Sequence, residues 1–202
     1  MRLKSWRMPL KNSNYELFLS RAAVALVTVV FLSGCSRLAG TKEAAVEEAA
    51  HGLKKVAVLP FNNISGRKDA AKIVTNTYLT ELFKSGRFRV EETGNVLQFM
   101  MQERIDVVGE MEIEKIQTLG KRLKVDGVLV GLVEEFDDGR GGPPTVSITA
   151  RLVESESGRV VWSEQRRKRG SDYIIIFGIG EIRSATALSQ RVVKEMIGTI
   201  TW

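Results

Sequence analysis

Lys54-Lys55-Val56-Ala57-Val58-Leu59-Pro60-Phe61 is the stretch that decides the fold of this chain. A continuous apolar run between lysines and a proline is typical of a strand that is buried on both faces. The polar residues 62–67 predict a turn, and residues 68–85 then place apolar side chains at helical spacing up to Gly86, a typical helix stop. Residues 87–90 predict a second short strand. This strand–helix–strand unit of about 35 residues predicts parallel strands joined by a right-handed crossover.

Two more helices are expected after this unit. Residues 91–105 and 112–123 each carry apolar side chains at helical spacing, with a break at Val108-Gly109 between them. Met100 and Met101 are expected to fill the core, because methionine adapts to irregular gaps. The side chains expected to face the core are Ala71, Val74, Tyr78, Leu82 and Phe83 in the helix at 68–85, and Ile113, Ile116, Leu119 and Leu123 in the helix at 112–123.

The remaining segments predict three strands in an antiparallel meander. Residues 125–136 form a long apolar strand, residues 145–154 alternate between apolar and polar side chains, and residues 159–165 follow a tight turn as the hairpin partner. A bend that contains glycines then leads into a final helix at 181–200. The predicted fold class is therefore α/β, with a mixed sheet built from an N-terminal βαβ unit and a C-terminal antiparallel meander, and with a C-terminal helix.

An apolar segment near the N-terminus predicts a secretory signal. Residues 22–32 are apolar except for Thr28, too few for the roughly 20 that a spanning helix needs, and they follow a segment of net charge +4 (five basic residues minus one acid). Leu32-Ser33-Gly34-Cys35 resembles the bacterial lipobox, which implies cleavage before Cys35 and attachment of diacylglycerol and palmitate-type acyl chains to it. By the rule for such lipoproteins, Ser36 favours the outer membrane. The alternative is an ordinary transmembrane or cleaved signal whose cysteine is incidental.

This signal divides the chain into three parts. Residues 1–34 are the signal peptide, residues 35–53 are the lipidated cysteine with a flexible tether, and residues 54–202 are a periplasmic domain. The tether has too few large apolar groups to dock firmly, and its His51, the only histidine of the chain, is expected to be a solvated linker residue. The 168 residues left after cleavage (202 minus 34) suffice for one domain with its own core.

Composition argues against several classes of function. The net charge is +6, of which the signal holds +4, and the remaining +2 (6 minus 4) comes without a basic stripe of the kind that binds nucleic acid. Residues 62–66 lack the glycine pattern of a nucleotide loop. With Cys35 acylated, no thiol remains for a disulfide, a nucleophile or a metal site, so we expect no metal, no cofactor beyond the acyl chains, and no enzyme. Adjacent acids do not face each other, so solvated turns are expected for Glu91/Glu92, Glu134/Glu135 and Asp137/Asp138.

The densest run of charge is Arg166-Arg167-Lys168-Arg169. One interpretation is an electrostatic patch for anionic lipid, glycan or an acidic partner, and the other is a solvated strand end. The apolar residues 173–177 that follow are either a packed edge segment or a partner contact. The loop at 137–144 is a second candidate contact. The candidate partner surface consists of Arg166, Arg167, Lys168, Arg169, Tyr173 and Phe177.

Three stretches taken together resemble the CsgG-type family of bacterial lipoproteins, named for the curli secretion channel, and the related activator lipoproteins of penicillin-binding proteins. They are KKVAVLPFNNISG (54–66), VDGVLVGLVEEF (125–136) and ARLVESESGRVVWSEQ (150–165). The resemblance implies a three-layer sandwich in the periplasm on a lipid anchor, with self-association into a ring. The curli channel crosses the outer membrane with strands from each subunit. The loop at 137–144 is too short for the roughly 20 residues of a spanning hairpin, so we expect no pore from this chain alone.

Two functions fit these features. The first is an outer-membrane-anchored periplasmic lipoprotein that serves as a non-enzymatic subunit or scaffold of an envelope assembly or secretion complex of the curli type. Its partners would be envelope proteins and copies of itself, with no nucleic acid and no nucleotide. The second is an activator that regulates a peptidoglycan synthase by direct contact. The tether at 36–53 reaches at most about 60 Å, and a protein crossing the periplasm would need more, which favours the first function.

Overall fold

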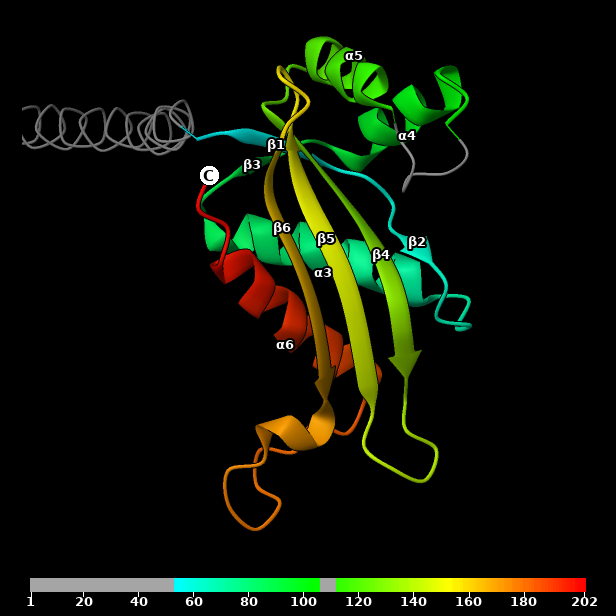
Figure 1. The fold of residues 1–202 in the computed structure, drawn as a ribbon, viewed down its shortest axis with the longest axis vertical. Coiled ribbons are helices and arrows are strands. Elements are labelled where there is room, and N and C mark those ends of the chain that lie inside the picture. Colours follow the sequence, from blue (N-terminus) through cyan, green and yellow to red (C-terminus); the bar gives the residue numbers. More distant parts are fainter. Residues whose placement is uncertain (1–52, 106–111) are drawn as a thin grey trace, which may run out of the picture. The chain divides into compact units, whose positions relative to one another are not determined.

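The computed structural model of the chain describes residues 53–105 and 112–202. These residues form one mixed sheet with helices on both faces (Figure 1), which confirms the α/β class. The strands are β1 (Lys55–Val58), β2 (Asn62–Asn63), β3 (Arg89–Val90), β4 (Gly127–Asp137), β5 (Thr145–Glu154) and β6 (Val160–Arg169). The helical elements are α3 (Ala70–Ser85), α4 (Thr93–Gln102), α5 (Ile113–Leu123), the short 3-10 helix η2 (Gly170–Tyr173) and α6 (Ala185–Gly198).

The sheet combines a parallel half and an antiparallel half. Its strand order is β3-β1-β4-β5-β6, with the short β2 also paired to β4. The pairs β1–β3, β1–β4 and β2–β4 are parallel, whereas β4–β5 and β5–β6 are antiparallel. The register of β4 against β5 shifts between Val133 and Glu135, where β4 carries a bulge. The predicted βαβ unit and the predicted meander are both confirmed.

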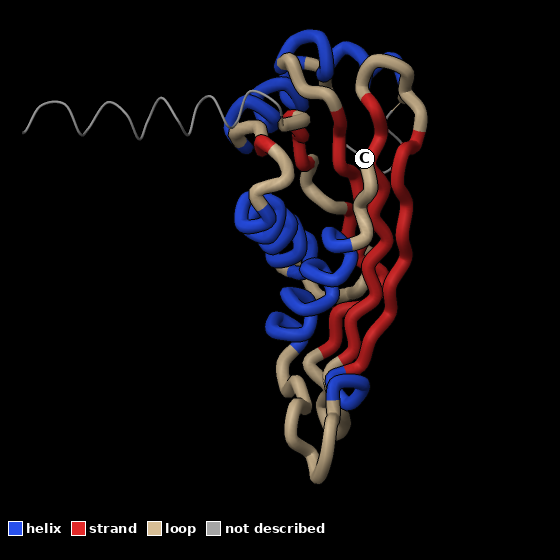
Figure 2. Tube along the Cα trace, turned by 90° about the vertical axis from the view of Figure 1, so that its left-hand side faces the viewer, coloured by secondary structure: helices blue, strands red, loops and turns tan. Residues whose placement is uncertain are grey.

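Helices cover the two faces of the sheet unequally. The helices α3 and α6 pack on one face over most of its length and enclose the larger core. The helices α4 and α5 pack on the other face, but only near β1 and the start of β4, over a smaller core. Figure 2 shows the sheet from its side, with the long strands bare on one face below α4 and α5. The fold is therefore a three-layer sandwich in which one outer layer is short.

The helices α3 and α6 run in the same direction, side by side (Figure 1). The helix α3 ends at Gly86, as the sequence predicts. Gly86 has a left-handed φ of 61°, and its N–H donates to the carbonyl of Phe83 at 3.2 Å. The next residue, Arg87, donates to the carbonyl of Ile197 at 3.2 Å and also to that of Ile200, at the end of α6. The C-terminal ends of the two helices are thus tied together.

A glycine in β4 makes room for an aromatic pair in the larger core. The ring of Phe61 stacks on Tyr78 with 4.8 Å between ring centroids. A Cβ atom on Gly131 would lie 2.1 Å from the Phe61 ring, so only glycine fits here without movement. Tyr78 is fully buried, which raises the pKa of its hydroxyl, and it donates to the sulfur of Met196 at 3.2 Å. This column of side chains links the segment after β1 to α3, β4 and α6.

Several details differ from the sequence predictions. The strand β2 was not predicted, because two asparagines carry no strand signal and only the pairing with β4 defines them. The strand β6 extends to Arg169 rather than 165. The last helix begins at Ala185 rather than 181, since the hydroxyl of Ser184 caps it by accepting from the Ala187 N–H at 3.2 Å. Three side chains predicted to be buried are exposed: Phe83, Met101 and Ile113.

Among residues 53–105 and 112–202, no helix is both long and apolar enough to cross a membrane. The predicted signal peptide, the lipobox Leu32-Ser33-Gly34 with Cys35, and His51 lie outside the described residues. They remain predictions from the sequence.

Candidate interaction surface

The four basic residues of the charge run lie within β6, and their side chains point alternately to opposite faces of the sheet. Arg166 faces α6, where its guanidinium donates to Glu195 at 3.0 Å and also pairs with Glu164. Arg167 faces the other way and pairs with Glu135, with 2.7 Å between Nε and Oε2. The charge run is therefore divided between the two faces of the sheet and does not form one patch.

The other two members of the run follow the same alternation. Lys168 lies on the α6 side, with its Nζ atom 5.9 Å from the centroid of the Tyr173 ring. Arg169 is exposed, and its backbone N–H donates to the carboxylate of Asp172 at 2.9 Å, where η2 begins. The strand thus leads directly into a short helical turn that holds Tyr173.

Tyr173 is anchored to α6 through Glu195. Its hydroxyl donates to the Glu195 carboxylate at 3.3 Å, and Arg191 donates to the same carboxylate at 2.9 Å. Burial, and then the negative charge of Glu195, raise the pKa of Tyr173 to about 12. Partial burial alone would raise the pKa of Glu195, but the bonds from Arg191 and Tyr173 and the charge of Arg166 outweigh it, and the pKa is lowered. Of the predicted surface, Arg166 and Tyr173 therefore stabilise the fold through one shared carboxylate.

The sheet face opposite α3 and α6 is polar where α4 and α5 do not reach. We call it the open face. Its centre is Glu134, whose carboxylate accepts from Ser147 at 2.7 Å, Thr149 at 2.6 Å and Gln165 at 2.7 Å. Burial alone would raise the pKa of Glu134, but these three hydrogen bonds outweigh it, and the pKa is lowered. A hollow of about 540 Å³ lies over this face. The open face consists of Glu134, Glu135, Ser147, Thr149, Gln165 and Arg167.

The strand β6 also forms a long edge of the sheet. In the part of the chain that the structure describes, β6 pairs with β5 alone, so its outer backbone groups have no strand partner. Such an edge is a template for another strand, and proteins commonly protect it with charged side chains. The four basic residues of the charge run lie along this edge.

The loop between η2 and α6 contains the most exposed apolar segment of the described residues. We call residues 174–180 the tip; its sequence is IIIFGIG. Phe177, one of the predicted surface residues, is 99% exposed and lies at its apex with a left-handed φ of 49°. The tip lies beyond the ends of β5 and β6, at the end of the domain farthest from α5 (Figures 1 and 2). The apolar run marks this segment in the sequence, but only the structure shows that it is exposed.

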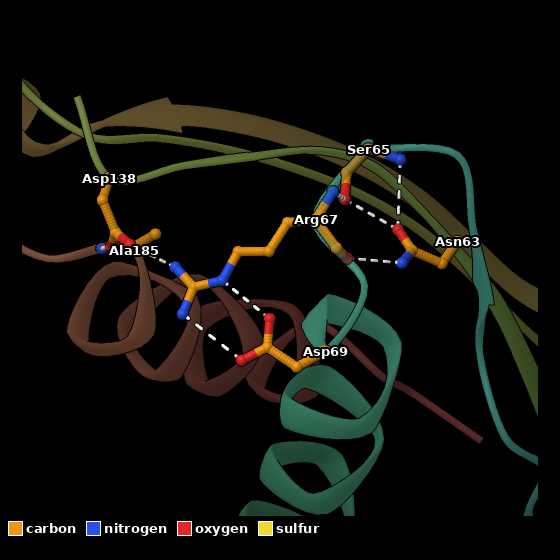
Figure 3. Close-up of polar contacts among 6 residues, drawn as sticks. All are labelled: Asn63, Ser65, Arg67, Asp69, Asp138 and Ala185. Atoms are coloured by element: carbon orange, nitrogen blue, oxygen red, sulfur yellow. Dashed lines mark hydrogen bonds and ion pairs between the residues drawn. The ribbon is translucent and has the colours of Figure 1, made fainter. Parts of the chain in front are cut away.

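A polar network lies at the same end of the sheet (Figure 3). Arg67 donates to Asp69 at 2.8 Å and also pairs with Asp138. The hydrogen bond from Arg67 lowers the pKa of Asp69. Asp138 accepts from the N–H of Ala185, the first residue of α6, at 3.0 Å, while the amide of Asn63 donates to the carbonyl of Arg67 at 2.6 Å. The turn at 62–67 therefore joins the N-terminal ends of α3 and α6, which is a structural role.

Two of the three acid pairs expected in solvated turns lie elsewhere, so that prediction was wrong for them: Glu134 and Glu135 lie in β4, and Glu91 is buried. Glu91 directly follows β3 and pairs with Lys55 of β1, and the amide of Asn95 donates to it at 2.7 Å. Burial alone would raise the pKa of Glu91, but the hydrogen bonds from Asn95 and Lys55 outweigh it, and the pKa is lowered. The pair holds β1 and β3 together next to α4.

A second hollow, of about 630 Å³, lies at the end of the domain opposite the tip. The Nζ atom of Lys54 lies 3.7 Å from the centroid of the Trp202 ring in its wall. Side chains of both charges line this hollow, so it does not favour ligands of one charge. None of the sequence predictions included it. Among the described residues, no group of three or more histidine, cysteine or acidic side chains is arranged to hold a metal ion. The charged lining residues are Lys54, Lys121, Lys124, Asp126, Glu154 and Glu156.

Comparisons with known proteins place the fold among bacterial structures. No protein-family model and no curated protein sequence matches this chain. The lipoprotein GNA1162 from Neisseria meningitidis is similar over 73% of this chain and 99% of its own, with 23% identity and a TM-score of 0.51. A PelC dodecamer from Paraburkholderia phytofirmans is similar over 72% of this chain and 85% of its own, with 19% identity and a TM-score of 0.51. At these identities, the likeness shows a shared fold.

Proposed function

We propose that this chain is a lipid-anchored protein of the bacterial envelope that acts without catalysis, as a subunit or scaffold of an envelope assembly. It joins further copies of itself and other envelope proteins. The observation that carries the proposal is the open face together with the free edge of β6, which we call the assembly surface. The tether and Cys35 hold the domain at the outer membrane, on its periplasmic side, as the lipobox implies.

The chemistry of the assembly surface supports contact with another protein. Its side chains are polar, yet they are ordered by mutual hydrogen bonds, as around Glu134. Polar surfaces of this kind occur in protein interfaces, which carry about one hydrogen bond per 100–200 Å² and trapped water. The neighbouring edge of β6 can accept a strand from a partner through main-chain hydrogen bonds.

Self-association has support of its own. The PelC structure with this fold is a dodecamer. A closed ring needs two different surfaces on each copy, so that the contacts run head to tail. The β6 edge lies on one flank of the sheet and β3 on the other, which gives two distinct flanks for such contacts. Membership of the CsgG-type family, which the sequence resembles, is part of this proposal.

The test is site-specific photo-crosslinking of the full chain in cells. A photoreactive residue replaces Ser163, which is exposed on β6 and points to the same side as the open face, or Lys72, an exposed residue of α3 that serves as the control. We expect strong crosslinks from position 163 to copies of the same chain and to envelope proteins, and weak ones from position 72. Equal crosslinking at both positions would contradict the assembly surface. Recovery of a peptidoglycan synthase from position 163 would favour the activator function instead.

Charge reversal gives a second readout. Arg167→Glu with Arg169→Glu changes two exposed side chains of β6, and we expect it to reduce crosslinking from position 163 several-fold. Lys72→Glu with Lys68→Glu is the charge-matched control and should leave crosslinking unchanged. Arg166 is left intact because it pairs with Glu164 and Glu195 inside the fold.

A further inference from the structure

We propose that the tip inserts shallowly into a lipid bilayer and forms a second membrane contact, separate from the acyl chains on Cys35. This contact uses neither the open face nor the edge of β6, so it goes beyond the proposed assembly function. It would set how the domain is oriented on the membrane, which a flexible tether alone leaves free.

The tip exposes a continuous apolar surface. The tip has no charged or polar side chain, and its two glycines are its only small residues. Phe177 is 99% exposed, Ile175 78% and Ile179 69%, with Ile174 and Ile176 also exposed. Apolar side chains gathered in this way on a water-facing loop mark an interaction site.

Apolar side chains also surround the tip on all sides of the loop. Successive residues of an extended segment point to opposite sides. Ile174, Ile175 and Ile176 are consecutive and all exposed, so apolar groups project from both sides of the loop. A groove on a protein partner would cover one side and leave the other in water. A bilayer surrounds the tip and covers both.

Some backbone groups of the tip are already hydrogen-bonded to each other. Polar backbone groups are costly to place in lipid unless they are hydrogen-bonded. The N–H of Ile175 donates to the carbonyl of Ile179, and the N–H of Ile179 donates to the carbonyl of Ile176, both at 2.9 Å. The left-handed φ values of Phe177 and Gly178 let the chain reverse within this small hairpin. Part of the backbone is thus already paired for an apolar medium.

Basic side chains flank the base of the tip. Lys168, Arg169 and Arg183 lie beside it in the chain, and long basic side chains reach lipid phosphates while their stems stay in apolar surroundings. Two acids are also present: Asp172 accepts from the backbone N–H of Arg169, and Glu181 pairs with Arg183 at 3.2 Å, so the net charge of these five groups is +1 (three minus two).

The base of the tip is fixed to the domain, so that insertion would orient the whole domain. Tyr173, the residue before the tip, donates to Glu195 of α6. On the other side, the N–H of Ile182 donates to the carbonyl of Gly170 at 3.2 Å, and Gly170 donates to the carbonyl of Pro144 at 2.8 Å. A shallow depth of about 5–10 Å is typical for such apolar surface elements.

The test uses the full chain reconstituted in vesicles of three parts phosphatidylethanolamine to one part phosphatidylglycerol. Ile176→Cys carries an environment-sensitive fluorophore, and Lys72→Cys on α3 carries the same label as the control. We expect blue-shifted emission at position 176, quenched by lipids brominated near the headgroup end of the acyl chain, and water-like emission at position 72. Phe177→Ser with Ile179→Ser should lower the ratio of inserted to free tip roughly a hundredfold, at about tenfold for each large side chain.

Two outcomes would overturn the proposal. In one, the label at position 176 is as water-exposed as the control. In the other, its emission is shifted but brominated lipids do not quench it, which would mean that the tip contacts protein. The unmutated chain serves as a separate check, because labelling of Cys35 would contradict the lipid anchor of the proposed function, and its emission can be subtracted from that of the variant labelled at position 176.

Discussion

Replacing Gly131 by alanine should destabilise the domain by about 1–2 kcal/mol. The new Cβ would lie 2.1 Å from one ring carbon of Phe61 and 2.5 Å from two others. Ordinary contact begins at 3.4 Å, so the ring must retreat by 1.3 Å (3.4 minus 2.1). It has little room to do so, because Phe61 is buried and stacked on the fully buried Tyr78. Overpacking costs about 1–3 kcal/mol, and the lower entropy of the unfolded alanine chain offsets roughly 0.5–1 kcal/mol of it.

The assay is urea unfolding of the full chain, followed by tryptophan fluorescence, with the free energy of unfolding taken from the midpoint and slope. Gly142→Ala is the matched control, since no atom lies within 4 Å of its new Cβ and its φ is not left-handed. It should change the free energy of unfolding by no more than about 0.5 kcal/mol.

A double substitution isolates the contact between the two residues. Phe61→Leu removes the ring atoms that meet the new Cβ, so Gly131→Ala should cost less in that background, by a coupling energy of about 1 kcal/mol or more. If Gly131→Ala proves as mild as Gly142→Ala, or if the two changes simply add, then Phe61 does not limit the space at Gly131 and the reasoning fails.

Two further predictions test the polar contacts. Arg166→Ala should lower the free energy of unfolding by about 1–3 kcal/mol, because it leaves the partly buried Glu195 without one partner. Arg167→Ala on the open face should lower it by no more than about 1 kcal/mol. Equal losses for the two variants in urea unfolding would contradict the alternation of side chains along β6. The pKa of Glu195 in the folded protein is below its ordinary value of 4.5, so its contribution to stability is complete above that pH and is lost as the pH falls further. In unfolding measured from pH 7 downward, Glu195→Gln should therefore show a smaller loss of stability in acid than the unmutated chain, and parallel curves would refute this assignment.

Much of the fold could be predicted because its signals are local. The bounds predicted for the alternating strand, 145–154, are those of β5, but the face expected to be exposed is only partly so, because Ser147 and Val153 are buried. The last helix likewise carries Leu188, Val192 and Met196 at helical spacing, and all three are fully buried.

The remainder depends on contacts between distant segments, which local patterns do not encode. The sequence alone assigns Glu91 to a turn, and only the fold shows that Lys55 of β1 lies beside it. The charge run reads as one patch until β6 is seen to continue through it and to send its side chains to two faces. The tip could be recognised as apolar from the sequence, but its exposure follows only from its position beyond the ends of the strands.

The parallel course of α3 and α6 has an electrostatic consequence. Each helix carries a dipole equivalent to about half a positive charge at its N-terminus and half a negative charge at its C-terminus. Two parallel neighbours therefore repel each other at both ends. The chain places Asp69 and Asp138 at the two positive ends, and Arg87 on the carbonyls at the negative end of α6. Each such charge contributes about 0.3–1 kcal/mol at low salt. Packing of the two helices should therefore depend on acids and bases that lie outside their apolar contact.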